Sequence, residues 1–191
     1  MSKTQVRENP IFTRSRAALI GGVDELLTQL PAAEISVTDV VAAAGMSRPT
    51  FYQHFTDLGS AFAAAGLARL TAMFAEIDPV APGELAEKFA EVVGRMEQHA
   101  KFYSRVQDSQ GGAAFHAGAV ALTAAWLRQV PALSGLPADD DALWEFVAAG
   151  VAWIITGHLA AYCRHPGDPS LRPADDLVRI LEALPIEGAI S

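Results

Sequence analysis

The sequence contains a single cysteine, Cys163, among its 191 residues. One cysteine cannot form an intramolecular disulfide or a thiolate metal cluster, which fits a reducing, cytoplasmic location. Cys163 itself is expected to be a small, buried core residue. Residues 1–15 contain charges and Pro10 but no apolar run, so no secretory signal peptide is expected.

Alternating β-branched residues, which mark strands, are almost absent beyond the short stretch 34–37. Alanine, leucine, valine and glutamate dominate instead, and 51% of the residues are hydrophobic. A chain of this length and composition buries a core, as one compact body or two small helical domains. The prediction is an all-α fold.

Positive charge is also scarce, with 14 Lys and Arg against 22 Asp and Glu and a formal net charge of −8. Such a field repels a polyanion at long range, which argues against a protein that coats nucleic acid without selectivity. Residues 1–60 carry five basic and six acidic side chains, a net charge of −1, which leaves −7 for the rest. The acidity is therefore concentrated in the C-terminal two thirds.

Patterns typical of catalysis or metal binding are missing. The five histidines show no His-x-x-x-His or Glu-flanked spacing, and the lone cysteine has no evident partner. The sequence has neither a phosphate-binding loop nor a nucleophile elbow. No enzyme activity, catalytic residue, metal ligand or cofactor is predicted.

Apolar spacing and capping residues predict helices along most of the chain. The first runs from about residue 10 to 30, with an apolar stripe formed by Leu19, Val23, Leu26 and Leu30. Gly21 and Gly22 interrupt it for no reason that the sequence reveals. Longer helices are expected near 57–77, 83–107 (bent near His99), 112–130, 139–164 and 173–184.

The stretch 146–163 has 18 residues without Lys, Arg, Asp or Glu, which is close to the lower limit for a membrane span. It stands alone, is rich in alanine and contains His158. A helix buried in a bundle or a dimer is therefore the better interpretation, and no membrane partner is predicted.

Two short capped helices are expected between the first helix and residue 57. Ser36 caps one, with Asp39 at its third helical position, and Gly45 ends it. Ser47 caps the next, which tolerates Pro49 in its first turn and runs to about residue 55. This layout is that of a helix-turn-helix, although short helical hairpins also occur in proteins that never bind DNA.

The second short helix crowds hydrogen-bonding side chains into two turns, while Phe51 and Phe55 face inward. An ordinary surface helix of so acidic a protein would carry Glu and Lys instead. The composition therefore favours a helix that reads the major groove.

Residues 35–55, with the sequence ISVTDVVAAAGMSRPTFYQHF, are similar almost position by position to the helix-turn-helix signature of the tetracycline-repressor (TetR/AcrR) family. Arg16, ahead of the apolar stripe, also fits, so the resemblance covers about the first 65 residues. It implies a three-helix DNA-binding domain at 10–56 and a helical bundle at 57–191 for effector binding and dimerisation.

The resemblance implies a ligand-responsive transcriptional regulator, most often a repressor, that binds a palindromic operator in double-stranded DNA as a homodimer. The implied DNA-binding residues are Ser36, Thr38, Ser47, Arg48, Pro49, Thr50, Tyr52 and His54. Ser36, Thr38, Tyr52 and His54 are expected at phosphates, and Arg48 and Thr50 at base edges. Ser36 and Ser47 would be caps even without DNA, and Tyr52 could equally be packed with its hydroxyl free.

One position departs from the family pattern, because Leu58 and Gly59 stand where a lysine usually begins the fourth helix. A phosphate contact is therefore missing. Backbone N–H groups after Asp57 are expected to replace it in part, and Lys3, Arg7 or Arg14 to reach the adjacent groove.

For the C-terminal part the resemblance is architectural and implies a bundle that encloses an apolar or amphipathic small-molecule effector. Its expected ligand-binding residues are Met73, Phe89, Met96, His99, Phe102, Tyr103, Trp126 and Trp153. Phe74, Phe115, Trp144, His116 and His158 are further candidates. Each residue of both sets, taken alone, is more often ordinary core. The homodimer is expected to form through the last two helices, 139–164 and 173–184, where Gly150, Gly157 and Ala161 permit close approach. A purely intrachain core helix is the alternative for 139–164, and a helical protein-binding adaptor is the alternative function.

Overall fold

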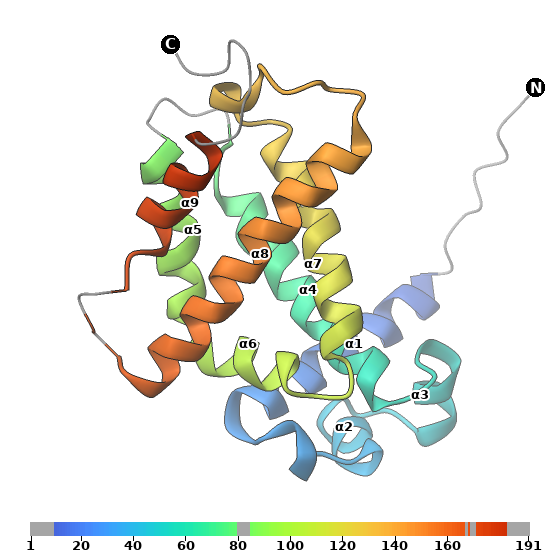
Figure 1. The fold of residues 1–191 in the computed structure, drawn as a ribbon. Helices are drawn as coiled ribbons and strands as arrows, with labels where there is room; N and C mark the ends of the chain where they lie inside the picture. Colours follow the sequence, from blue (N-terminus) through green and yellow to red (C-terminus); the bar gives the residue numbers. More distant parts are fainter. Residues whose placement is uncertain (1–9, 80–84, 167, 169–170, 183–191) are drawn as a thin grey trace, which may run out of the picture.

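The computed structural model describes residues 10–79, 85–166, 168 and 171–182, and all regular secondary structure within them is helical (Figure 1). The helices are α1 (Pro10–Gln29), α2 (Val37–Ala43), α3 (Arg48–His54), α4 (Leu58–Glu76), α5 (Leu85–Glu97), α6 (Ala100–Gln107), α7 (Gly112–Leu127), α8 (Asp141–Arg164) and α9 (Pro173–Glu182). Single 3₁₀ turns occupy Ala32–Glu34 and Pro131–Leu133. The predicted all-α fold is confirmed.

Helix α1 is the centre of the N-terminal part, since it packs against α2, α3, α4 and α6. Its fully buried row is Leu19, Val23 and Leu27 at i, i+4 spacing. Leu26 is half-buried and packs against the core, whereas Leu30 is 37% exposed, so the predicted stripe is wrong at its last residue. The helix ends at Gln29 and Pro31 follows, so Leu30 lies beyond the packed face.

The structure explains one of the two adjacent glycines in α1. A Cβ at Gly22 would lie 3.1 Å from the backbone nitrogen of Ala44 and 3.2 Å from the carbonyl oxygen of Val40. Gly22 therefore permits the close approach of α1 to the end of α2. Gly21 faces solvent, and a Cβ there would meet nothing within 4 Å.

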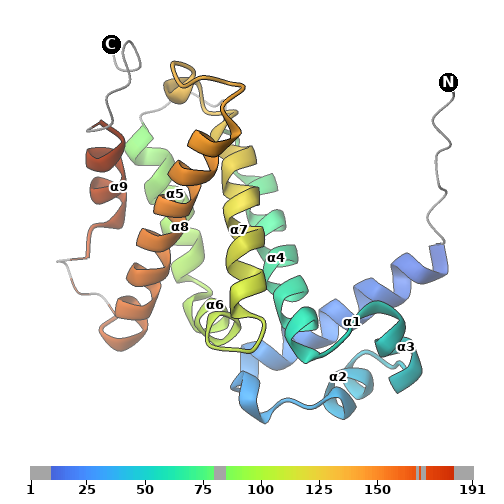
Figure 2. The ribbon, with the colours of Figure 1, turned by 45° about the vertical axis from the view of Figure 1, so that its right-hand side comes forward.

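The remaining helices form a bundle on one side of α1–α3 (Figure 2). Helix α4 leads into it and packs against α1 and α7, α7 packs against α8, and α5 against α9. The short α6 lies at the end of the bundle nearest α1 and contacts α1, α7 and α8. Both α4 and α6 thus link the bundle to the N-terminal helices.

The helix expected at 83–107 is two helices. Helix α5 ends at Glu97, and His99, with φ −123° and ψ 22°, precedes α6. The predicted bend near His99 is thus a full break. Residue 83 and residues 183–184, the expected limits of two helices, lie outside the described residues.

Helices α4 and α8 are each long and apolar enough to cross a membrane, and both pack against other helices of the bundle. Helix α8 buries Val147, Val151 and Ile155, yet it leaves Phe146 67% and Trp153 74% exposed. Within the single chain α8 is therefore buried on one face, and burial of the other face in a dimer stays a prediction. Cys163, in the last turn of α8, is half-buried and packs against the core, so it lies at the edge of the core and not inside it.

Candidate DNA-binding surface and ligand cavity

The two short helices are set by their caps. The Ser36 hydroxyl accepts a hydrogen bond from the Asp39 N–H at 3.3 Å, and the Asp39 carboxylate accepts one from the Ser36 N–H at 2.8 Å. The Ser47 hydroxyl likewise accepts from the Thr50 N–H at 3.3 Å. These hydrogen bonds satisfy backbone N–H donors that the first turn of each helix leaves unpaired, so residues close in sequence define the start of both helices.

The turn between α2 and α3 depends on Gly45. Its φ is +63°, in the left-handed region that costs a residue with a Cβ about 1 kcal/mol or more. The Gly45 N–H donates to the carbonyl of Ala42 and the Met46 N–H to that of Val41. This ending directs the chain from α2 into the cap of α3.

Helix α3 has a packed face and a free face. Phe51 and Phe55 are buried beneath it, whereas Tyr52 is 54% exposed. The remaining exposed residues that the sequence assigns to DNA are Ser36, Thr38, Ser47, Arg48 and Pro49. Thr50 is half-buried and shares a 2.8 Å hydrogen bond with the Ser47 hydroxyl. The structure thus brings six of the eight predicted residues to one exposed region of α2 and α3.

His54 is held differently from that prediction. Its Nε2 lies 2.7 Å from the Ser15 hydroxyl, and its ring centroid lies 4.1 Å from that of Phe12, both on α1. Burial lowers the pKa of His54 below its ordinary value of 6.5, and the positive charge of Arg16 lowers it further. A neutral imidazole packed on α1 joins two helices, so a phosphate contact by His54 would require its ring to leave this position.

The start of α4 carries Leu58 and Gly59 at the position where the family pattern usually has a lysine. Leu58 is half-buried and packs against the core, and a Cβ at Gly59 would lie 2.9 Å from the side chain of Gln110. The Asp57 carboxylate accepts from the Ser60 N–H at 2.7 Å. These hydrogen bonds lower the pKa of Asp57. The Ser60 N–H, one of the backbone donors expected to replace the lysine in part, is therefore bonded to the Asp57 carboxylate within the chain. Of the basic residues expected to compensate, Arg14 is exposed on α1, and Lys3 and Arg7 lie outside the described residues.

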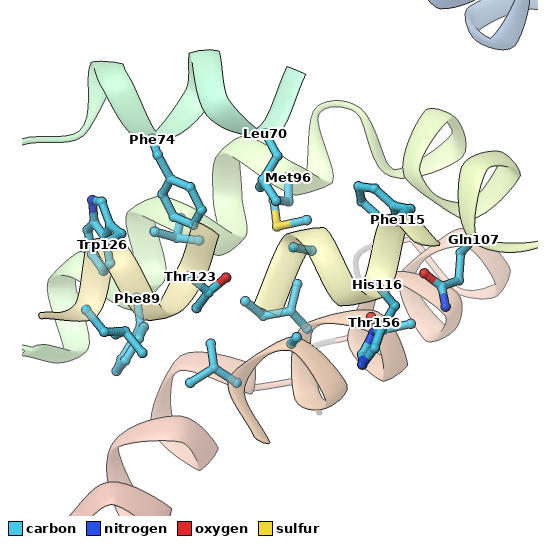
Figure 3. A pocket seen from close by; sticks show the side chains of 16 residues that line it. Leu70, Phe74, Phe89, Met96, Gln107, Phe115, His116, Thr123, Trp126 and Thr156 are labelled. Carbon is cyan, nitrogen blue, oxygen red and sulfur yellow. The ribbon is translucent and has the colours of Figure 1, made fainter. Parts of the chain in front are cut away.

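A cavity of about 40 Å³ lies inside the bundle, between α4, α5, α7 and α8 and the end of α6 (Figure 3). Phe89, Met96 and Trp126 line it as predicted, together with Phe74, Phe115 and His116. An adjoining cavity of about 140 Å³ shares four of the lining residues and adds Tyr103, whose pKa burial raises to about 12.

Other predicted ligand-binding residues lie elsewhere. Trp153 is 74% exposed on the far side of α8, so its assignment to the cavity is wrong. His99 and Phe102 line a separate surface hollow beside Arg69, and Met73 is buried without lining the cavity. Two of the weaker candidates are also engaged outside it. Trp144 donates to the Pro137 carbonyl at 3.0 Å, and His158 Nε2 lies 2.6 Å from Glu97 Oε1.

Sequence reasoning missed Gln107, Thr123 and Thr156, which supply hydroxyl and amide groups to the cavity. No spacing or motif singles them out, because they come from three helices that only the tertiary fold brings together. Among the described residues, no group of three or more His, Cys, Asp or Glu is placed to hold a metal ion.

No family model matches the sequence, and no curated protein matches it. Solved structures with this arrangement of helices include TetR-family regulators. One from Streptomyces coelicolor is 21% identical with a TM-score of 0.60, and the match covers 90% of this chain and 80% of that one. The repressor AlkX from Dietzia sp. strain DQ12-45-1b, implicated in biodegradation of n-alkanes, is 18% identical with a TM-score of 0.64 and coverage of 92% and 95%. The fatty acid degradation regulator FadR from Bacillus halodurans is 11% identical with a TM-score of 0.56 and coverage of 93% and 97%.

These likenesses establish the fold over nearly the whole chain. The protein has the all-helical architecture of the TetR-family transcriptional regulators, an N-terminal helix-turn-helix followed by a helical bundle. The resemblance seen in residues 35–55 is confirmed at that level.

Proposed function

We propose that this chain is a ligand-responsive transcriptional regulator of the TetR type that binds operator DNA as a homodimer. The observation that carries the proposal is helix α3, which is capped by Ser47, anchored by Phe51 and Phe55, and exposes Arg48 and Tyr52. A short helix whose apolar face packs against the rest of the domain, and whose exposed face carries polar side chains, fits the major groove. The fold of the solved neighbours supports the same function.

In this proposal Arg48 reads a base and the other exposed side chains position the helix. The Arg48 guanidinium can donate two hydrogen bonds to guanine O6 and N7, which discriminates by about 1–3 kcal/mol. Ser36, Thr38 and Tyr52 contact backbone phosphates. Thr50 is half-buried and already bonded to Ser47, so its part in base contact is the smaller one.

The exposed face of α8 supports dimerisation. Phe146, Gly150, Trp153 and Gly157 recur at four- and three-residue spacing and are all exposed in the single chain. Two large apolar side chains flanked by glycines favour close helix pairing. The described outer face of α9 is polar, with Arg172, Asp175, Asp176 and Arg179 exposed, so α8 supplies the apolar part of the proposed interface.

The cavity inside the bundle is the proposed effector site. A volume of about 40 Å³ holds little more than a few water molecules, whereas small-molecule sites usually measure several hundred. An effector that enters it must part α8 from α4 and α7. A ligand that favours the parted state lowers operator affinity, and DNA lowers ligand affinity by the same factor.

In this proposal, two arginines couple the helical bundle to the DNA-binding helices. Arg105, on α6, donates to the carbonyl oxygens of Leu27 and Thr28 at 2.8 Å, and so caps the C-terminal end of α1. Arg69, on α4, pairs with Asp24 of α1. Movement of α4 or α6 is therefore passed to α1, against which the helix-turn-helix packs.

The test is DNA binding by the purified protein, with DNA from upstream of its own coding region against scrambled DNA. Sequence-selective binding that weakens steeply between about 50 and 200 mM salt is expected. Arg48→Ala should lose about tenfold or more of the selectivity, and Tyr52→Phe should lose less. Arg179→Ala, at an exposed arginine of α9, is the matched control and should bind as the parent protein does. Absence of binding to any DNA at low salt would contradict the proposal and favour the adaptor.

A further inference from the structure

The polar groups of the cavity are gathered at one end. Gln107 of α6, His116 of α7 and Thr156 of α8 lie together, whereas Phe74, Phe89 and Trp126 surround the opposite end (Figure 3). Phe74 and Trp126 stack with ring centroids 5.4 Å apart. The hydroxyl of Thr123 points into the space between the two ends (Figure 3). The lining thus has three polar side chains at one end, beside Phe115, and a mainly aromatic surface at the other (Figure 3).

These polar side chains lack partners within the protein. Among the described residues, no hydrogen bond is made by the side chains of Gln107, His116, Thr123 or Thr156, although Thr123 is only 8% exposed. Gln107, His116 and Thr156 are half-buried, so solvent can serve them in the unliganded protein. Polar side chains that have no protein partner and converge on an apolar cavity are typical of a binding site. A ligand is the natural source of the missing partners.

The lining also restricts the charge of that ligand. It contains no Lys, Arg, Asp or Glu, and the adjoining cavity, which shares Gln107 and Thr156, contributes Asp108. A ligand carboxylate buried in the cavity would have no permanent cation beside it, which is strongly unfavourable. Asp108 itself is exposed, so solvent screens its charge. Threonine hydroxyls, an imidazole and an amide both donate and accept, which matches an uncharged hydroxyl or carbonyl.

We propose that the effector is an uncharged, elongated molecule with an aliphatic or aromatic tail and one hydroxyl or carbonyl head. The head bonds to Gln107, His116 and Thr156, and the tail lies against Phe74, Phe89 and Trp126. This inference rests on the proposed function in treating the cavity as the effector site, but it does not depend on DNA binding. Gln107 lies two residues after Arg105 on α6, so the head contacts the helix that caps α1.

The test compares three probes of equal chain length, octan-1-ol, octanoate and n-octane, on the full chain. Binding is measured by ligand-induced stabilisation against thermal unfolding, each probe at the same free concentration within the solubility of n-octane. Octan-1-ol is expected to bind at least tenfold more tightly than either of the others. Octanoate binding as tightly as octan-1-ol, or n-octane doing so, would overturn the proposal, as would the absence of binding by octan-1-ol.

Variants locate the head group. Thr156→Val removes one hydroxyl at nearly constant side-chain volume. It should weaken the binding of octan-1-ol about tenfold and leave the binding of n-octane unchanged. Gln107→Leu, which removes the amide group from the same end of the cavity, serves as a second variant if Thr156→Val does not fold. Thr71→Val is the matched control, because Thr71 is exposed on α4 and its hydroxyl donates to the Leu67 carbonyl at 2.7 Å. An equal effect of the cavity variants and the control on octan-1-ol would overturn the assignment of the head.

The two proposals fail separately. Operator binding by the unliganded protein tests the regulator without any probe. Selective binding of octan-1-ol by a protein that ignores DNA would leave the cavity chemistry intact and remove the regulator.

Discussion

Arg69 of α4 and Asp24 of α1 form a two-pronged ion pair, with 2.9 Å from Nε to Oδ1 and 2.6 Å from Nη2 to Oδ2. The Arg69 guanidinium also lies 4.0 Å from the ring centroid of Phe102 on α6. One side chain thus joins three helices where the DNA-binding part meets the bundle. The pair is partly shielded, with side-chain exposures of 19% and 33%.

Arg69→Met should therefore lower the free energy of unfolding by about 1–2 kcal/mol, since it removes charge-assisted hydrogen bonds and a cation–π contact that solvent screens only in part. Urea denaturation measures the change. Arg179→Met is the control, because the Arg179–Asp176 pair is exposed at 77% and 52% and should contribute less than about 0.5 kcal/mol. Equal losses in the two variants would show that the position of Arg69 brings no extra stability.

The adjacent glycines of α1 should respond in opposite directions to alanine. Gly21→Ala should stabilise the protein by up to about 1 kcal/mol, because the helix gains a better former and the new Cβ meets open space. Gly22→Ala should destabilise it, because the backbone of α2 lies within 3.1 Å of the new Cβ. The two variants are each other's control in one urea series. Stabilisation by both substitutions would mean that α2 can move away from the new Cβ without lowering the free energy of unfolding.

Stability should fall when the pH drops below about 6.5, and His54 should account for part of the loss. The folded protein keeps His54 neutral with a lowered pKa, while the unfolded chain takes up a proton at the ordinary value of 6.5. The contribution is therefore complete above pH 6.5 and is lost as the pH falls through the lowered pKa.

In urea midpoints at about pH 7.5 and 5.5, which bracket the ordinary histidine pKa, His54→Gln should show a smaller pH dependence than the parent protein. His165→Gln, at an exposed histidine after α8, controls for loss of a histidine as such. If His54→Gln retains the full dependence, the packing of His54 on α1 is not its source.

Trp153→Glu should convert the proposed dimer to a monomer without unfolding it, because Trp153 is 74% exposed in the single chain and a charge in an apolar helix pairing is costly. Sedimentation velocity at micromolar concentration distinguishes the two states. Ala75→Glu, on the exposed face of α4, is the control and should remain dimeric. A Trp153→Glu variant that sediments like the parent protein would place the interface elsewhere.

Local residues were enough to predict the helices around the turn. Ser36 with Asp39, Ser47 with Thr50, and Gly45 act within four residues of one another, so their hydrogen bonds and dihedral angles depend little on the rest of the chain. The apolar face of α3 followed in the same way from Phe51 and Phe55. These features carried the resemblance from which the fold was correctly expected.

Contacts between distant segments were beyond such reasoning. His54 and Ser15 are 39 positions apart, and only the packing of α3 on α1 turns the predicted phosphate ligand into a helix contact. Trp153 and Trp126 look alike in sequence, yet the rotation of each helix places one in solvent and the other at the cavity. A hydrophobic side chain predicts burial, but it does not determine which neighbouring residue will cover it.

The amino-acid sequence thus decided the limits of most helices, the turn at Gly45 and the polar character of α3, because short-range hydrogen bonds and dihedral preferences govern all of these. The tertiary structure alone decided that Arg69 meets Asp24, that Gln107, His116 and Thr156 share one end of a cavity, and that α8 keeps an exposed apolar face. Those outcomes depend on how whole helices pack, and packing is a collective property that no single stretch of sequence contains.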